Sequence, residues 1–325
     1  MSTGYMTRRG AVAGLLAIGA GGIQNQLWPG PGAADTKGAT HDPLLYFSDY
    51  FSFVGRDSTG WVHFAIDNNR GRAGDAYQAD HFIVMHDEQS GWVQLKGSQH
   101  YENAEKQLER IPDSPYFKFN GSHASGTVMQ SATNDLRMDV GPLPKVLYRE
   151  NADGIFWLGG APATLVWNKR TLKGRVIIEY LQRHNWNRFV ADFTANWRNF
   201  NGLYLMTDGN ADFYMHYHER EGGSDLNGKI VGFASWRTPA PIADIDFNVL
   251  RSVSADGGKY RWPVEWQVDF QHDGKAYRLM LAKRERADIA HWDTGGFAMT
   301  VASGLIVAKD GTERHQVTGW AELLI

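Results

Sequence analysis

The fold is decided by two strand-like runs, Arg175–Tyr180 (RVIIEY) and Asp212–Glu219 (DFYMHYHE), and by the segment Gln182–Trp186 (QRHNW) that follows the first run. A β-strand points successive side chains to opposite faces. The second run therefore has one titratable and aromatic face, opposed by a mainly apolar face of Phe213, Met215 and Tyr217. The titratable face consists of Asp212, Tyr214, His216 and His218. A strand of this kind suits a small-molecule pocket in an antiparallel barrel.

Composition excludes several classes of function. The chain has 325 residues with a formal net charge of −3, so it has no strongly basic character for binding nucleic acid. It contains no cysteine, which rules out disulfides, thiol nucleophiles and cysteine-ligated metals. Phosphate-loop, dinucleotide-binding and nucleophile-elbow motifs are all missing from the region after the leader. Nucleotide-dependent chemistry and ordinary serine hydrolysis are therefore not expected.

Strand signals recur at short, regular intervals from residue 44 to the end and predict an all-β, antiparallel meander. One short helix is expected at Asn103–Arg110, which Pro112 ends. A turn is expected at Asp67–Gly71 because Asp, Asn and Gly favour turns. The length fits two domains, which we place at 44–188 and 189–325.

Several motifs give the chain a family resemblance over roughly residues 145–325. In order and spacing they resemble the carotenoid 1,2-hydratase (hydroxyneurosporene synthase) and AttH group. The matching segments are Glu179-Tyr180 with His184-Asn185-Trp186, Trp197–Phe200, Leu203–Asn210, Tyr260–Trp266, Ala290–Asp293 and Thr318–Leu323. The chain departs from the group's pattern at Gln182 and Arg183, where relatives carry an acid or a histidine, and at Asn187, where they carry glycine.

The resemblance implies a fold and an activity. The fold is two lipocalin-like antiparallel β-barrels, each closed around an interior that can hold one ligand. The activity is a cofactor-independent hydratase or cyclase reaction on a hydrophobic, isoprenoid-like substrate. The enzyme class is then a hydro-lyase of the carotenoid 1,2-hydratase type.

Such a reaction requires a general acid that protonates an alkene carbon, aromatic faces that hold the cation, and a base that accepts a proton from water. A carboxylic acid in a dry pocket can be the acid, because burial keeps it protonated. We assign His184, Glu179 and Asp212 to proton handling. The substrate-contacting residues are expected to be Tyr180, Trp186, Trp197, Tyr214, His216 and His218.

Each assignment has a structural alternative. The cluster of Tyr180, His184 and Trp186 could instead join the two domains by packing. His216 and His218 share one strand face, as a zinc site would require, but Asp212 is their only nearby third ligand. We therefore expect pocket lining without a metal.

The N-terminus predicts export. Arg8-Arg9 precedes the apolar run Ala11–Ile23, which resembles a twin-arginine signal although no Phe-Leu follows the arginines. We expect a signal over residues 1–34 and a linker over 35–43, which would place the protein in the periplasm or outside the cell. A leader without structure is the alternative. The run is too short to span a bilayer comfortably, so no stable membrane span is expected.

Two other functions stay open. An exported lipocalin-like carrier of a lipid or terpenoid would need the pocket but no acid. A secreted hydrolase would need a nucleophile, and none is found. An enzyme should have a carboxyl or histidine of strongly shifted pKa in the cavity, whereas a carrier should have a uniformly apolar interior. The sequence does not indicate the substrate, the direction of the reaction or the oligomeric state.

Overall fold

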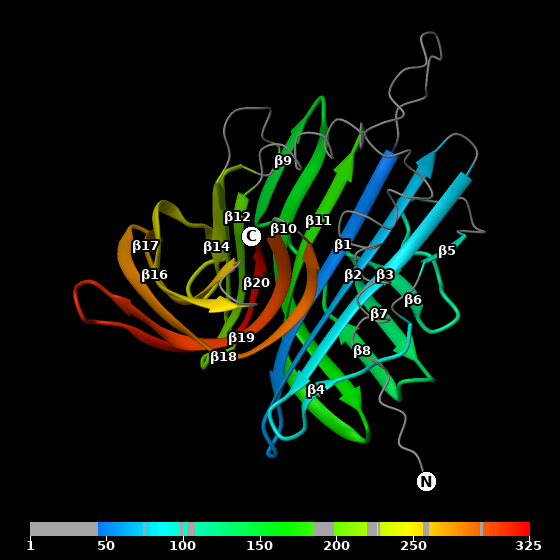
Figure 1. The fold of residues 1–325 in the computed structure, drawn as a ribbon, viewed down its shortest axis with the longest axis horizontal. Coiled ribbons are helices and arrows are strands. Elements are labelled where there is room, and N and C mark those ends of the chain that lie inside the picture. The colour runs from blue at the N-terminus through cyan, green and yellow to red at the C-terminus, as the bar shows by residue number, and fades with distance from the viewer. Residues whose placement is uncertain are drawn as a thin grey trace.

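The computed structural model describes residues 45–73, 76–97, 100–102, 108–184, 198–219, 226, 228–255, 260–292 and 295–325. Within these residues the chain forms strands and no helix. The strands build two curled antiparallel sheets that lie side by side (Figure 1). The predicted all-β class with two lipocalin-like units is confirmed.

The first sheet has eleven strands in the order β4-β3-β2-β1-β11-β10-β8-β7-β6, with β5 paired to β3 and β9 to β10. Its first strand pairs with its last, so the chain returns to the middle of the sheet. The strands are β1 (Leu45–Arg56), β2 (Trp61–Ala73), β3 (Ala76–Asp87), β4 (Gly91–Val93), β5 (His100–Glu102), β6 (Lys118–Ser122), β7 (Gly126–Ser131), β8 (Leu136–Val140), β9 (Leu147–Asn151), β10 (Gly154–Trp167) and β11 (Arg170–Arg183).

The second sheet has nine strands in the order β15-β14-β13-β12-β20-β19-β18-β17-β16, and here too the first strand pairs with the last. Strand for strand this is the order of the first sheet, so the two halves share one topology. The strands are β12 (Arg198–Thr207), β13 (Asp212–Glu219), β14 (Ile230–Ala234), β15 (Ala240–Pro241), β16 (Ala243–Ala255), β17 (Tyr260–His272), β18 (Lys275–Trp292), β19 (Gly295–Ala308) and β20 (Arg314–Leu324).

Three expectations need correction. The turn at Asp67–Gly71 is wrong, because β2 runs straight through it. These polar residues fit a strand because both faces offer partners: Arg70 pairs with Asp49 on one face, and Ser48 donates to Asp67 on the other. In the predicted helix, residues 108–110 form a bend, and residues 103–107 lie outside the described part. Neither barrel is closed, since the described residues show no pairing of β4 with β6 or of β15 with β16.

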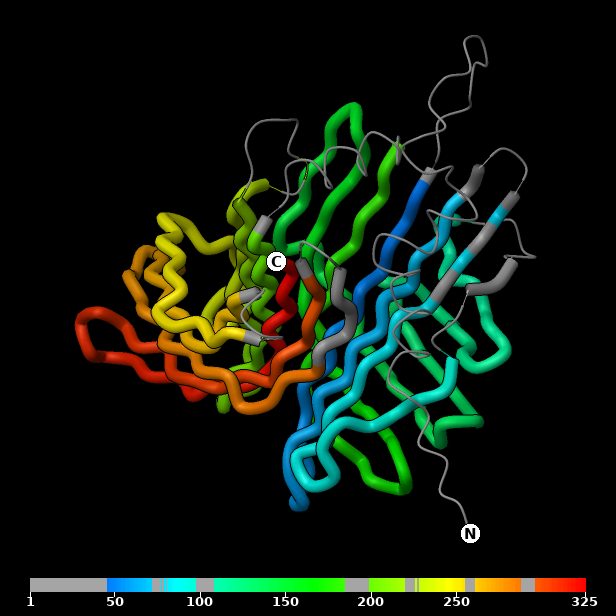
Figure 2. Tube along the Cα trace, viewed as in Figure 1, coloured from blue at the N-terminus to red at the C-terminus, as the bar shows by residue number. Residues whose placement is uncertain are grey.

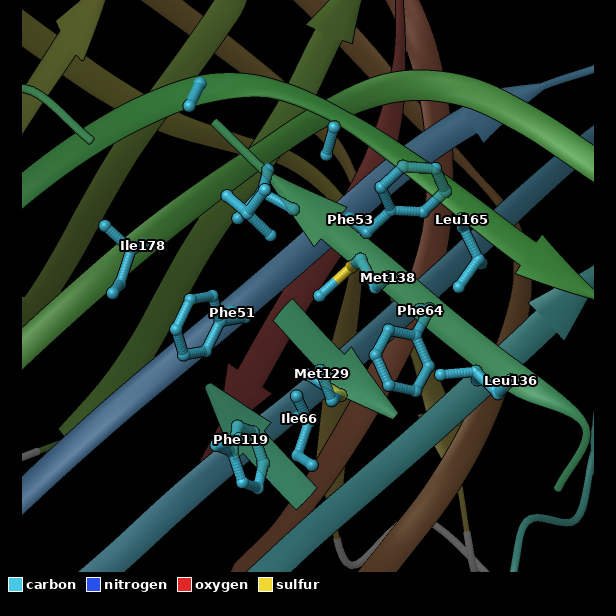
Figure 3. Close-up of a cluster of buried hydrophobic side chains, with 14 of the residues drawn as sticks. Phe51, Phe53, Phe64, Ile66, Phe119, Met129, Leu136, Met138, Leu165 and Ile178 are labelled. Carbon is cyan, nitrogen blue, oxygen red and sulfur yellow. The ribbon is translucent and has the colours of Figure 1, made fainter. Parts of the chain in front are cut away.

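Alternation along the strands divides the apolar side chains into three cores. The concave side of the first sheet holds one core, with Phe51, Phe53, Phe64 and Ile66 packed against β7 and β8 (Figure 3). The concave side of the second sheet holds another, built around Trp262 and Trp266. Burying side chains of this size stabilises the fold by roughly 1.5–3 kcal/mol each.

The third core lies between the two sheets. It combines Tyr46 and Phe156 of the first sheet with Phe233 and Trp320 of the second. The C-terminal strand β20 lies in the middle of the molecule, against the first sheet (Figure 2). The titratable face of β13 points into this inter-sheet space, because Tyr214 belongs to the third core whereas Phe213 and Met215 belong to the concave core.

Some predictions fall outside the described residues, namely the leader, the linker, Trp186 and Trp197. The strands of the two sheets fall on either side of the expected boundary near residue 188, which is itself not described and stays a prediction. A search of the described part for a helix long and apolar enough to cross a membrane finds none.

Candidate functional site

The first sheet brings two carboxyl groups and a tyrosine together on the face that meets the second sheet. Tyr50 of β1 pairs with Glu179 of β11 on one side and with Asp67 of β2 on the other. Residues directly opposite in adjacent strands point to the same face. Glu179, Tyr50 and Asp67 therefore form one row across three strands.

The second sheet places its own polar row opposite. In β12, Tyr204 lies between Tyr214 of β13 and Trp320 of β20. Two residues away along these strands, Gly202 of β12 pairs with His216 of β13 on one side and with Glu322 of β20 on the other. The Tyr50 and Tyr204 rings meet across the sheets with centroids 4.9 Å apart. We call Asp67, Glu179 and Glu322 the carboxyl cluster.

Glu179 is the centre of the hydrogen bonding. The Tyr204 hydroxyl donates to Glu179 Oε2 at 3.1 Å, and the Tyr214 hydroxyl oxygen lies 2.5 Å from the same atom. Tyr214 also contacts His216 Nδ1 at 2.9 Å, and His216 Nε2 lies 3.0 Å from the carbonyl oxygen of Gly228. These contacts form a chain from a carboxyl group to a backbone carbonyl.

The direction of these bonds locates a proton. A carbonyl oxygen only accepts, so His216 Nε2 carries the hydrogen, and in a neutral imidazole Nδ1 is then an acceptor. Burial, the largest cause, lowers the pKa of His216 to about 3, so the ring is neutral. Tyr214 must then donate to His216 Nδ1. Its oxygen can accept from Glu179 only if Glu179 is protonated, which is the arrangement that satisfies every contact.

The pKa values of the three carboxyl groups are all raised, the direction that favours a proton on each. Burial, the largest cause, raises the pKa of Glu179 to about 6, while hydrogen bonds donated by Tyr214 and Tyr204 would lower it. If Glu179 donates to Tyr214 instead, the bond between them no longer lowers the pKa of Glu179. Burial and the charges of Glu179 and Asp67 raise the pKa of Glu322 to about 8. Burial also raises the pKa of Asp67 to about 6, against the bond from Ser48. All three carboxylates are half-buried.

Asp212 is held in a different way. Arg175 of the first sheet donates from Nε and Nη2 to both carboxylate oxygens, and Ser235 also donates to Oδ2. Burial raises the pKa of Asp212 and the Arg175 guanidinium opposes that rise. A Cβ at Gly160 would lie 2.2 Å from Asp212 Oδ2, so glycine there leaves room for the carboxylate. Asp212 joins the sheets as an ion pair.

Tyr180 and His184 lie apart from Glu179. Tyr180 follows Glu179 on β11 and points to the concave side of the first sheet, where it stacks on Trp157. Its hydroxyl donates to Gln182 Oε1 at 3.4 Å, and Gln182 Nε2 lies 3.2 Å from His184 Nε2. The structure therefore brings together Glu179, Tyr214 and His216 of the predicted residues. It places Tyr180 and His184 on the other side of the sheet.

His218 lies next to the chain of hydrogen bonds. Its Nε2 is 2.9 Å from the Gly228 carbonyl oxygen, which His216 also contacts, and the two rings are 5.8 Å apart. Within the described residues, no group of three or more His, Cys, Asp or Glu is arranged to hold a metal ion.

A second polar group lies inside the first sheet. Arg70 and Asp49 form a fully buried ion pair, and His123 Nε2 lies 2.7 Å from Asp49 Oδ1. Burial alone would raise the pKa of Asp49, but Arg70 and His123 together lower it below the ordinary value. We call Asp49, Arg70 and His123 the inner cluster.

A cleft of about 700 Å³ opens between the sheets. It borders His63 and His86 of the first sheet and Met206, Val301 and Thr318 of the second, with charged residues at its rim. No member of the carboxyl cluster lines it. The cleft and the cluster are therefore separate regions of one inter-sheet space.

The comparisons with known proteins concern the fold. Neither protein-family models nor curated protein sequences match this chain. Among solved structures, an AttH protein from Nitrosomonas europaea aligns at a TM-score of 0.55 with 11% identity, over 87% of this chain and 92% of the other. CghA with Sch210972 aligns at 0.51 with 9% identity, over 87% and 88%. Kievitone hydratase from Nectria haematococca reaches 0.47 with 10% identity, over 87% and 89%.

At such identities the likeness to the AttH protein and to CghA shows a shared fold and does not extend to chemistry. The expected resemblance to the AttH group is confirmed at that level. Membership of the carotenoid 1,2-hydratase group stays a prediction.

Sequence reasoning missed Asp67, Tyr204 and Glu322. Asp67 was hidden by the turn-like composition around it. Glu322 had a usable signal, because Thr318, Trp320 and Glu322 alternate with apolar residues just as Asp212, Tyr214 and His216 do. Pairing of the first and last strands of the second sheet, which puts these two patterns on one face, could not be read from the sequence.

Proposed function

We propose that the protein is a cofactor-independent hydratase, or the reverse hydro-lyase, that acts on an isoprenoid-like alkene in the inter-sheet space, with Glu179 as the general acid. The observation that carries this is the hydrogen-bond chain, whose contacts are all satisfied only when Glu179 is protonated. A neutral carboxylic acid surrounded by tyrosine rings is what alkene protonation requires.

The reaction follows from the cluster. Glu179 transfers its proton to the less substituted alkene carbon, forming a C–H bond and a tertiary cation at the neighbouring carbon. The oxygen of a water molecule bonds to the cation, and Asp67 accepts the proton that this water loses. Transfer of that proton back to Glu179 restores the acid, so the net change is addition of one water.

Asp67 suits the part of the base. Its Oδ1 accepts a hydrogen bond from the Ser48 hydroxyl at 2.6 Å, which favours the ionised carboxylate. It lies two strands from Glu179, about 10 Å across the sheet, with Tyr50 between them. The faces of Tyr50, Tyr204 and Tyr214 can stabilise the cation electrostatically.

The same features argue against a simple carrier. A carrier of apolar ligands gains nothing from three carboxyl groups of raised pKa, since each costs desolvation free energy when buried. Uniformly apolar walls would bind a lipid more tightly. The raised pKa values of Glu179, Asp67 and Glu322 therefore favour the enzyme.

The test is isotopic. The protein is incubated with terpenoid alkenes in water enriched in oxygen-18, and mass spectrometry detects products heavier by one labelled water. We expect labelled alcohol from the wild type and at least a 100-fold slower formation by Glu179→Gln, a typical loss for general acid catalysis. Glu265→Gln, at an exposed ion pair with Arg251, is the matched control. Equal rates in wild type and Glu179→Gln would contradict the proposal.

A further inference from the structure

The cleft and the carboxyl cluster lie on the same strand faces. Along β2, His63 lines the cleft and Asp67 belongs to the cluster, with Ala65 between them. Along β20 the same order is Thr318, Trp320 and Glu322. Two residues of a strand span about 7 Å. One row of side chains therefore separates the cleft from the acids.

That row is thin on the side of the first sheet. It contains Ser52 and Ala65, which are paired neighbours in β1 and β2. Trp320 of the second sheet packs in the same core as Ala65, and its ring lies 5.5 Å from the ring of His63. Ser52 and Ala65 are the small members of this row, between Ile177 of β11 and Val84 of β3.

Four polar atoms follow this path without a hydrogen-bonding partner among the described residues: Tyr50 Oη, Ser52 Oγ, His63 Nδ1 and Trp320 Nε1. The residues are 6%, 1%, 2% and 0% exposed. Buried polar atoms of this kind normally bind ordered water, because an unsatisfied group costs roughly 1–3 kcal/mol. They offer both donors and acceptors, as a file of water molecules requires.

His63 is oriented for this purpose. Thr318 donates its hydroxyl hydrogen to the Ala302 carbonyl at 3.3 Å, so its oxygen accepts from His63 Nε2 at 3.2 Å. The ring is neutral, because burial lowers its pKa to about 3. Its Nδ1 lone pair is then an acceptor at the edge of the cleft.

We propose that the cleft is the water entrance of the site, and that water passes from it along His63, Trp320, Ser52 and Tyr50 to the carboxyl cluster. The inference rests on the proposed function, since it supplies the water that adds to the cation and exchanges the proton of Glu179. The charged rim of the cleft, with Arg56, Arg284 and Glu88, suits entry of water better than entry of an apolar substrate.

The experiment follows proton exchange directly, without a substrate. Protonated carboxyl groups have a carbonyl stretch in the infrared that shifts when deuterium replaces hydrogen. The protein is transferred rapidly into D₂O, and the shift is timed. Glu179→Gln and Glu322→Gln assign the bands. Ser303→Trp narrows the cleft that Ser303 lines, and Ser52→Ala removes one hydroxyl from the path. Ser125→Trp, in an exposed turn, is the matched control.

We expect the shift to slow about tenfold in Ser52→Ala, the change that one lost hydrogen bond allows. In Ser303→Trp we expect at least as large an effect, and in Ser125→Trp none. Unchanged exchange in both Ser52→Ala and Ser303→Trp would overturn the water entrance while leaving the acid in place. Absence of any protonated carboxyl band would overturn the proposed function itself.

Discussion

The ion pair of the inner cluster and two members of the carboxyl cluster, Glu179 and Asp67, lie back to back on neighbouring rows of the first sheet. Asp49 of β1 pairs with Tyr180 of β11, and the next residue, Tyr50, pairs with Glu179. Asp49 and Glu179 therefore point to opposite faces of the sheet. Asp49 is fully buried yet ionised, because Arg70 and His123 compensate its charge. Glu179 has tyrosines as its hydrogen-bonding partners, and burial raises its pKa to about 6. Compensation of charge, more than burial, therefore distinguishes the ionised Asp49 from Glu179, the proposed acid.

The largest expected effect is on the inner cluster. Arg70→Met leaves Asp49 charged, buried and without its main partner, so it should reduce the free energy of unfolding by about 3–5 kcal/mol. Urea titration followed by tryptophan fluorescence measures this. The double variant Arg70→Met with Asp49→Leu removes both charges and should recover most of the loss. A loss below 1 kcal/mol in the single variant would contradict the compensation argument.

The corresponding change in the carboxyl cluster should affect catalysis and spare the fold. Glu179→Gln keeps the shape of a neutral carboxylic acid, so we expect a change in unfolding free energy within about 1 kcal/mol. The 100-fold loss of labelled product described above should accompany it. If the variant were destabilised as strongly as Arg70→Met, Glu179 would be an ionised structural residue, contrary to this account.

The two clusters should also respond to pH with opposite signs. The folded pKa of Glu322, about 8, lies above its unfolded value, so the native state holds more protons between pH 4.5 and 8. Its contribution to stability is full at the acidic end and is lost as pH rises through 8. Asp49 has a lowered pKa, and its contribution is lost as pH falls.

Urea unfolding of the wild type and of Glu322→Gln from pH 5 to 8.5 isolates the contribution of Glu322 to stability from that of Asp49. The difference in unfolding free energy between the two proteins should change steadily with pH, in the direction that the wild type loses stability as pH rises. A constant difference would mean that Glu322 is not protonated in the native state.

The smallest effect is expected at His184. It contacts Gln182 on the far side of β11 from the carboxyl cluster. His184→Ala should therefore change the rate of labelled product formation by no more than about twofold, the usual range for a site outside the reacting groups. A loss comparable to that of Glu179→Gln would restore His184 to the proton-handling role first assigned to it.

The sequence predicts the local pattern well and the pairing between distant strands poorly. Alternation in Asp212–Glu219 correctly separates the face of Tyr214 and His216 from that of Met215. Glu179 is found for the same reason. Asp67 is misread because its neighbours favour turns in isolation, while partners on both faces of β2 hold them extended. Glu322 joins the cluster only through the pairing of β12 with β20, more than a hundred residues apart.

The central claim is that Glu179 holds a proton that an exposed glutamate would lose. Nuclear magnetic resonance of carbon-13 in the glutamate carboxyl groups, with Glu179→Gln to assign the signal, measures its titration directly. We predict that Glu179 titrates with a midpoint at a pH of about 6 or above. Its titration should be coupled to that of Glu322, because the two carboxyl groups interact. A midpoint at or below the ordinary value of 4.5 would contradict the account.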